Sequence, residues 1–306
     1  MKTLSQDTKT TYLYTALITP FDADGKVDFA VLESLVKEQQ GAGNGILLCG
    51  STAEGLALEP SEQLSIVEFV VALNVSVPIM VAVGGYHLDQ QLTWIKHCNE
   101  LNVDAFLLTA PLYAKPGPVG QTMWFKALLD ATDKPCMLYN VPSRSGVQIY
   151  CETVSNLAEH KNLWAMKEAS GDIHQFIALR DAAPKMKMYS GEDGLMPYLA
   201  SAGAVGLVSV CSNPWPQASN LYVQKSLQGT RPEALNVWYS AVNSLFEVAN
   251  PIPVKVLMHK LGLISTPLLR APLTHLELDS DQALIAADKA IKAWLKQHDV
   301  TLKAVN

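Results

Sequence analysis

The sequence predicts an α/β protein: a (β/α)8 barrel, or TIM barrel, followed by a C-terminal helical appendage. Short runs rich in Val, Ile, Leu and Met alternate eight times with amphipathic, helix-like segments. The runs are almost continuously apolar, which is typical of strands in a parallel sheet covered on both faces. Eight such units within about 230 residues fit a closed barrel better than an open doubly wound sheet.

The predicted elements follow one another regularly along the chain. Strands are expected to begin near Tyr12, Gly45, Pro78, Asp104, Pro135, Leu163, Met186 and Val205. Apolar residues recur at three- and four-residue spacing in eight helices, namely Phe29–Gln40, Ser61–Leu73, Leu88–Asn99, Gln121–Ala131, Cys151–Glu159, Ile173–Ala182, Leu195–Ala202 and Trp215–Leu227. Ser61, before an acidic first turn, and Asp172, after a glycine, are predicted starts of two of them.

The strand pattern ends after Gly229, and the rest of the chain reads as helices. These are interrupted by Asn250-Pro251-Ile252-Pro253 and by two later prolines, and the final segment from Asp279 to His298 is amphipathic. We therefore expect two domains, a catalytic barrel over residues 1–230 and a C-terminal helical domain over residues 231–306.

Composition excludes several classes of protein. The 306 residues are 49% hydrophobic and 17% charged, as in a globular protein with a large core. The net charge is −6 and no dense Lys/Arg run occurs, so nucleic acid is not an expected partner. The five cysteines lie far apart and are expected to be reduced. The N-terminus is too polar for a signal peptide and the most apolar stretch, residues 67–85, is interrupted, so we expect a cytoplasmic protein without a membrane partner.

Polar side chains stand at the C-terminal ends of several predicted strands, where (β/α)8 barrels carry their chemistry. These positions are Gly50-Ser51-Thr52 after the second strand, Tyr113 after the fourth, Tyr139 to Arg144 after the fifth, Lys167-Glu168 in the sixth and Ser190 to Asp193 after the seventh. We expect them to converge on one rim of the barrel.

Lys167 is the most informative of these residues. It ends the apolar run 163–166, and because inward and outward positions alternate along a strand, it is expected to point into the barrel mouth. A lysine that reaches out to solvent or pairs with an acid is the alternative reading. Schiff-base catalysis needs an uncharged amine, which burial favours and an adjacent carboxylate opposes. We therefore expect Glu168 to point away from the amine.

Hydroxyl groups and one arginine complete the candidate set. Forming and dehydrating a carbinolamine requires proton transfer, for which Tyr139, Ser51 and Tyr113 are available, although each could instead pack or cap a turn. Arg144 is one of only four arginines and could bind a substrate carboxylate with its planar fork, or be a solvated loop charge.

Other functional motifs are missing from the sequence. The glycine-rich stretch 41–45 precedes a strand, so it is not a dinucleotide cradle, and there is no P-loop, G-x-S-x-G or H-E-x-x-H. The histidines are scattered, and neither Cys49 nor Cys211 has a histidine partner nearby. We expect neither a cofactor nor a metal.

Five motifs carry a family resemblance. They are Gly50-Ser51-Thr52-x-Glu54, Tyr139-Asn140-Val141-Pro142-Ser143-Arg144-Ser145-Gly146, Lys167-Glu168-Ala169-Ser170-Gly171, Ser190-Gly191-Glu192-Asp193 and Asn250-Pro251-Ile252-Pro253-Val254-Lys255. In this order they resemble the dihydrodipicolinate synthase (4-hydroxy-tetrahydrodipicolinate synthase) family, class I pyruvate-dependent aldolases that include N-acetylneuraminate lyase. The similarity extends over nearly the whole chain.

The resemblance implies a role for each matching residue. Lys167 would form the imine with pyruvate, Tyr139 would donate and accept protons, and Ser51 and Tyr113 would complete a hydroxyl relay, with Tyr113 supplied across a dimer interface. Thr52, together with Gly50, would hold the pyruvate carboxylate, Val208 would line the pocket through its carbonyl, and Arg144 would receive the carboxylate of aspartate-4-semialdehyde. The implied product is the precursor of lysine and diaminopimelate, and the implied assembly is a homotetramer, a dimer of dimers.

Alternatives within and outside the family remain open at this point. N-acetylneuraminate lyase usually lacks an arginine at the position of Arg144, which favours the synthase; a 2-keto-3-deoxy acid aldolase and a non-catalytic small-molecule binding protein are further possibilities. Ser51 stands where threonine is commoner, and the hydroxyl is retained. Gly55, Gln63, Leu88 and Leu112 stand where lysine-inhibited members carry polar or aromatic groups, so we expect weak or absent inhibition by L-lysine.

Overall fold

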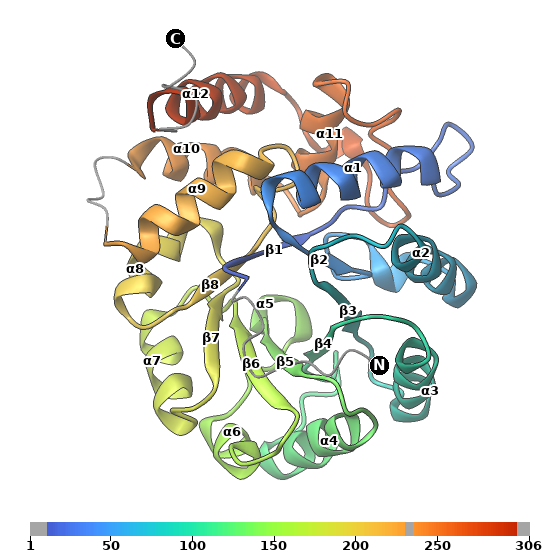
Figure 1. Cartoon of the computed structure of the whole chain (residues 1–306), viewed down its shortest axis with the longest axis vertical. Helices are drawn as coiled ribbons and strands as arrows, with labels where there is room; N and C mark the ends of the chain where they lie inside the picture. Colours follow the sequence, from blue (N-terminus) through green and yellow to red (C-terminus); the bar gives the residue numbers. More distant parts are fainter. Residues whose placement is uncertain (1–10, 230–234, 299–306) are drawn as a thin grey trace.

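The fold is a closed barrel of eight parallel strands (Figure 1). The computed structural model describes residues 11–229 and 235–298. Each strand pairs with the next along the chain, and the last pairs with the first. The strands are β1 Leu13–Ala16, β2 Gly45–Leu48, β3 Ile79–Val83, β4 Ala105–Thr109, β5 Cys136–Asn140, β6 Leu163–Glu168, β7 Lys187–Ser190 and β8 Gly206–Ser209. The predicted fold class is confirmed.

Helices surround the barrel and cover the outer faces of the strands (Figure 1). They are α1 Phe29–Ala42, α2 Pro60–Ala72, α3 Leu88–Asn99, α4 Pro118–Asp130, α6 Cys151–Leu157, α7 Ile173–Ala182, α8 Met196–Ser201 and α9 Pro216–Leu227. Three short turns of helix follow strands at the rim, η1 Gly55–Ala57, α5 Pro142–Ser145 and η2 Asp193–Leu195. These three are too short to show the periodicity on which the predicted helices rest.

One of the two predicted helix starts is confirmed and the other is wrong. The Asp172 side chain caps α7 by accepting a hydrogen bond from the His174 N–H at 2.8 Å. For α2 the cap is Glu59, not Ser61, and proline occupies the first helical position. The Glu62 carboxylate accepts the Glu59 N–H at 3.0 Å, so the acidic first turn belongs to a capping box that begins two residues earlier.

Alternation along the strands separates two buried layers. Inward-facing residues form a cluster inside the barrel that includes Met137, Tyr139, Ala165 and Tyr189. Outward-facing residues such as Met166 pack against the surrounding helices in a much larger cluster. In β6 this alternation places Ala165 and Lys167 on the inner face, because their neighbours Met166 and Glu168 face outward.

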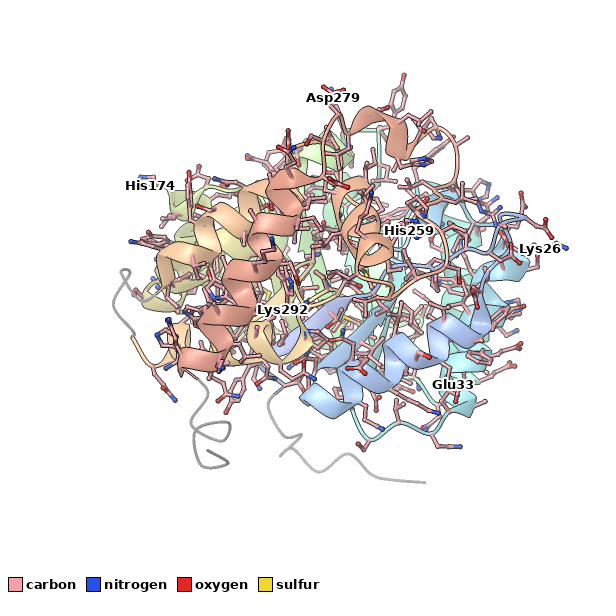
Figure 2. The ribbon with its side chains drawn as sticks, turned by 90° about the horizontal axis from the view of Figure 1, so that it is seen from above. Lys26, Glu33, His174, His259, Asp279 and Lys292 are labelled. Carbon is pink, nitrogen blue, oxygen red and sulfur yellow. The ribbon has the colours of Figure 1, made fainter. Side chains whose placement is uncertain are left out.

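The C-terminal part of the chain is helical, as predicted, and packs against one side of the barrel. It consists of α10 Asn236–Leu245, α11 Ile252–Lys260, η4 His275–Glu277 and α12 Gln282–His298. Figure 2 looks onto this side, where His259 of α11, Lys292 of α12 and Glu33 of α1 are labelled. Trp238 stacks on Tyr222 of α9 with a centroid distance of 4.3 Å, which joins the appendage to the core of the barrel. The predicted domain boundary at 230/231 lies outside the described residues.

The cysteines are all free, and four of them are buried. Burial raises the pKa of the Cys136 thiol to about 12 and also raises those of Cys49 and Cys211, so these thiols stay protonated at neutral pH. Among the helices of the described residues, none combines the length and the apolar character needed to cross a bilayer.

Candidate active site

A cavity of about 440 Å³ opens at the C-terminal ends of the strands and collects most of the predicted site residues. Six of the eight line it: Gly50, Ser51, Thr52, Tyr139, Arg144 and Lys167. The 246–250 segment, which connects α10 to α11, also lines it. The site is therefore built by the barrel and the C-terminal helices together.

Lys167 projects from β6 into this cavity. Its side chain is buried, and Nζ lies 4.2 Å from the centroid of the Tyr139 ring, which stands directly opposite on β5. Within residues 11–229 and 235–298 no carboxylate lies within salt-bridge distance of this amine. The protein thus holds an amine without an ionic partner against an aromatic face and an open cavity.

Glu168 occupies the opposite face of the strand, as predicted. Its Oε1 accepts hydrogen bonds from Asn140 Nδ2 at 2.8 Å and from the Ser170 N–H at 3.0 Å. Burial raises the pKa of Glu168, and these hydrogen bonds counteract part of that rise. The carboxyl is fixed in the outer layer, where it does not compete for the Lys167 amine.

The loop after β2 presents two hydroxyls to the cavity, and contacts from the C-terminal helices hold it. Ser51 is exposed, whereas Thr52 is buried and its Oγ1 accepts a hydrogen bond from Asn250 Nδ2 at 3.0 Å. Glu54, in the left-handed backbone region with φ of 57°, forms a buried ion pair with Lys255 of α11 at 2.7 Å. This ion pair holds the loop in a conformation that non-glycine residues rarely adopt.

Arg144 lies in the short helix α5 at the cavity wall. Its Nη2 donates a hydrogen bond to the backbone carbonyl of Asn250 at 2.9 Å. The Ser145 hydroxyl stabilises the same turn, because its oxygen lies 3.0 Å from the Val141 carbonyl and 2.7 Å from the Val147 carbonyl and shares one donated proton between them. The guanidinium is thereby anchored at one end while still lining the cavity.

Two predicted site residues lie away from the cavity lining. Tyr113 is 88% exposed, with φ of 66°, and its N–H donates to the Ser145 carbonyl at 3.0 Å. Val208 is buried in the barrel interior, and Val210, two residues further on, lines the cavity. A single chain therefore brings together Lys167, Tyr139 and Ser51 but leaves Tyr113 facing outward.

Two further residues, which carry no role in the sequence-based prediction, belong to the site. Glu192 lines the cavity, and its pKa is raised to about 7, mainly by burial and further by Asp193, while Lys167 lowers it. Asn250 contacts both Thr52 and Arg144. The position of Glu192 directly after a strand is a sequence feature that could indicate a site residue. The contacts of Asn250 have no such local feature, because they join residues that are 198 and 106 positions apart in the sequence.

Comparison with known proteins agrees with this geometry. The model of the dihydrodipicolinate synthetase family matches residues 9–291. The chain belongs to this family. A 4-hydroxy-tetrahydrodipicolinate synthase from Francisella tularensis subsp. novicida is 52% identical over 283 residues, which cover 92% of this chain and 96% of the relative.

Solved structures of family members share the fold over nearly their full length. A 4-hydroxy-tetrahydrodipicolinate synthase from Methylacidiphilum fumariolicum SolV matches with a TM-score of 0.89 and 31% identity, covering 95% of this chain and 99% of that one. A dihydrodipicolinate synthase from Acinetobacter baumannii, complexed with pyruvate, matches with a TM-score of 0.85 and 33% identity, covering 93% and 98%. As a member of the dihydrodipicolinate synthetase family, the chain is an enzyme of the lyase type, and the predicted family and enzyme class are confirmed.

Proposed function

We propose that this enzyme condenses pyruvate, held as a Schiff base on Lys167, with aspartate-4-semialdehyde, as expected of a 4-hydroxy-tetrahydrodipicolinate synthase. The observation that carries the proposal is the buried Lys167 amine, which has no ionic partner and lies against the Tyr139 ring in the cavity. Thr52 and Arg144 line the same cavity and supply donors for two carboxylates. Both substrates are carboxylates, so the donor set fits them.

The first half of the reaction makes a nucleophile from pyruvate. The Lys167 amine attacks the carbonyl carbon, and the carbinolamine loses water to give the imine. The Thr52 hydroxyl and the backbone at Gly50 hold the pyruvate carboxylate. Tyr139 and Ser51 transfer protons to and from the carbinolamine oxygen, after which loss of a methyl proton gives the enamine.

The second half joins the two substrates. The enamine carbon attacks the aldehyde carbon, whose oxygen takes up a proton, while Arg144 binds the carboxylate of the aldehyde substrate. The amino group of the adduct then attacks the imine carbon and displaces Lys167, which closes the ring and restores the free amine. One water is released per product, in the imine-forming step.

Tyr113 enters this scheme through oligomerisation. It is exposed after β4, and two further exposed apolar side chains, Leu56 after β2 and Tyr86 after β3, stand at the same C-terminal rim of the barrel. Apolar side chains gathered at one rim are typical of an interface. We infer that Tyr113 completes the proton relay in the site of a second copy, within a homotetramer built of two dimers, and that the enzyme acts in the cytoplasm.

A substrate panel tests the proposed reaction. Purified enzyme is supplied with pyruvate and each candidate aldehyde, or with N-acetylneuraminate and 2-keto-3-deoxy acids in the cleavage direction. We expect kcat/KM for aspartate-4-semialdehyde to exceed that for every other acceptor by at least about 100-fold, because only an acceptor with a matching carboxylate uses Arg144. Faster cleavage of N-acetylneuraminate or of a keto-deoxy acid would contradict the proposal.

A further inference from the structure

Gly191 follows β7 directly and lines the cavity. Its φ lies outside the left-handed region, so the backbone conformation does not require a glycine here. The surrounding space does require one. A Cβ placed on Gly191 would lie 2.5 Å from the Ala169 Cβ, 3.0 Å from Lys167 Cε and 3.1 Å from the Glu168 carbonyl oxygen. Ordinary van der Waals contacts of a Cβ begin at about 3.4 Å, so no larger residue fits without a shift.

The backbone of Gly191 is fixed against β6. Its N–H donates to the Glu168 carbonyl at 2.6 Å, next to the parallel pairing of Glu168 with Ser190. The Ser190 hydroxyl donates to the Glu192 carbonyl at 2.8 Å and accepts the Glu192 N–H at 3.0 Å. These bonds hold the turn after β7 close to β6. Crowding at Gly191 is therefore not relieved by a movement of its own backbone.

The end of the Lys167 side chain has neighbours from two strands. β6 lies between β5 and β7, and the Tyr139 ring of β5 has its centroid 4.2 Å from Nζ. From the end of β7, Gly191 approaches Cε of the same side chain. The lysine thus has an aromatic ring on the β5 side and a position without a side chain on the β7 side.

We propose that Gly191 is a positioning residue for the Schiff-base reaction, because its missing side chain leaves the space that the end of Lys167 needs when the amine faces Tyr139. The inference rests on the proposed function. With a Cβ at this position, the lysine would turn away about its own flexible side-chain bonds, at little cost in stability. The amine would then leave its place in the cavity, and a displacement of about 1 Å at a reacting atom can lower a rate about 100-fold.

The contact with Ala169 acts on stability instead. The Ala169 Cβ is fixed by a backbone whose N–H donates to the Asn140 carbonyl at 2.9 Å, so it cannot rotate away from a new methyl group. Overpacking of this kind destabilises a protein. Ala169→Gly removes this closest contact and leaves the contact with Lys167 in place. Substitutions at the two positions therefore separate crowding of the fold from crowding of the lysine.

The test measures the rate of imine formation in the unmodified enzyme, Gly191→Ala, Ala169→Gly and the double variant. Each protein is mixed rapidly with pyruvate at several concentrations, borohydride traps the imine after set times, and the reduced Lys167 peptide is quantified by mass spectrometry. The limiting rate at saturating pyruvate separates imine formation from pyruvate affinity. For Gly191→Ala we expect this rate to fall about 100-fold, with a lower thermal midpoint.

The double variant distinguishes positioning from folding. We expect it to recover at least about half of the loss in thermal midpoint, while its limiting rate stays at least about tenfold below that of Ala169→Gly. This comparison carries the test if Gly191→Ala alone does not fold. Gly41→Ala is the matched control, because Gly41 is exposed in α1 and a Cβ there meets nothing within 4 Å; it should leave the rate unchanged.

Three results would overturn the inference. The first is an unchanged limiting rate in Gly191→Ala, and the second is recovery of the rate together with the midpoint in the double variant, which would assign the loss to packing alone. The third is slower turnover of aspartate-4-semialdehyde with unchanged imine formation, which would assign the space at Gly191 to the second substrate. Absence of any adduct on Lys167 in the unmodified enzyme would instead contradict the proposed function itself.

Discussion

At the scale of single residues, neighbouring positions on one strand have opposite surroundings. Lys167 faces the cavity, whereas Glu168 is hydrogen-bonded in the outer layer, and the alternation of a β-strand is enough to separate them. The sequence predicts both orientations because each depends only on strand parity. It does not predict that the Tyr139 ring faces the amine at 4.2 Å, since that depends on the register between β5 and β6.

Removing one hydroxyl tests the role of Tyr139. Tyr139→Phe keeps the ring against Lys167 but removes the proton donor. We expect kcat to fall by about 10²- to 10⁴-fold, the usual contribution of a positioned acid or base, with little change in the thermal midpoint. Steady-state kinetics with both substrates measures the effect, and a kcat within a factor of about two of the unmodified enzyme would exclude Tyr139 from proton transfer.

Glu192 gives a pH-dependent prediction for stability. Its pKa is raised to about 7 from an ordinary value of 4.5, mainly by burial, so the folded enzyme holds this proton more tightly than the unfolded chain. The stability that the protonated Glu192 side chain gives the folded enzyme is fully present below pH 4.5 and is lost as the pH rises through about 7. Glu192→Gln removes this dependence, so at pH 8 the variant should be more stable, by up to about 3 kcal/mol.

Thermal midpoints at pH 5 and pH 8 check the sign. The stabilising effect of Glu192→Gln should be much smaller at pH 5 than at pH 8. Glu100→Gln, at an exposed position following α3, is the matched control and should show no difference between the two pH values. An equal effect of Glu192→Gln at both pH values would contradict the raised pKa.

At the scale of elements, the sequence predicts the strands better than the ends of the helices. Every predicted strand is present, and α3 and α7 have the predicted bounds, because continuous apolar runs and helical periodicity are local signals. The start of α2 was misplaced because a capping box with glutamate, together with Pro60, is less distinctive than a serine cap. Short α5, which carries Arg144, has no periodicity from which to predict it.

The contact between α11 and the β2 loop makes a stability prediction. Lys255 and Glu54 form an ion pair whose side chains are 0% and 2% exposed. Lys255→Met leaves the Glu54 carboxylate buried without its partner and should destabilise the enzyme by about 3–5 kcal/mol. Glu54→Gln combined with Lys255→Met should recover a large part of this loss, because no charge is then left unpaired.

Urea or thermal denaturation of the two variants measures the difference. Lys260→Met, in the same helix at an exposed position, is the control and should have a small effect because surface ion pairs contribute little. If the double variant were no more stable than Lys255→Met alone, the loss could not be assigned to an unpaired Glu54 charge.

At the scale of the whole molecule, the barrel was predictable from one repeated local pattern, whereas the completed site was not. The 246–250 segment reaches the cavity only because the C-terminal helices pack beside it. Asn250 meets Thr52 across 198 residues, and no local feature of either motif indicates that contact. In the proposed assembly, the role of Tyr113 in the proton relay requires a second copy of the chain.

Weak or absent inhibition by L-lysine is a further prediction at this scale. Leu88 and Leu112 offer no partner for a charged ligand, and Gln63 already donates its amide to the Gly55 and Leu58 carbonyls at 2.7 and 3.3 Å. Binding L-lysine there would bury charge without compensation. We expect no inhibition up to about 1 mM L-lysine, a concentration that corresponds to only weak binding. An inhibition constant in the micromolar range would refute this expectation.

The proposed reaction depends on a covalent imine between Lys167 and pyruvate. The most direct measurement is borohydride reduction of the enzyme in the presence of pyruvate, followed by peptide mass mapping. We predict a reduced pyruvate adduct on the Lys167 peptide and none on the peptide of Lys255, which is also buried but is held in an ion pair. An unmodified Lys167 peptide, or an adduct on another lysine instead, would contradict it.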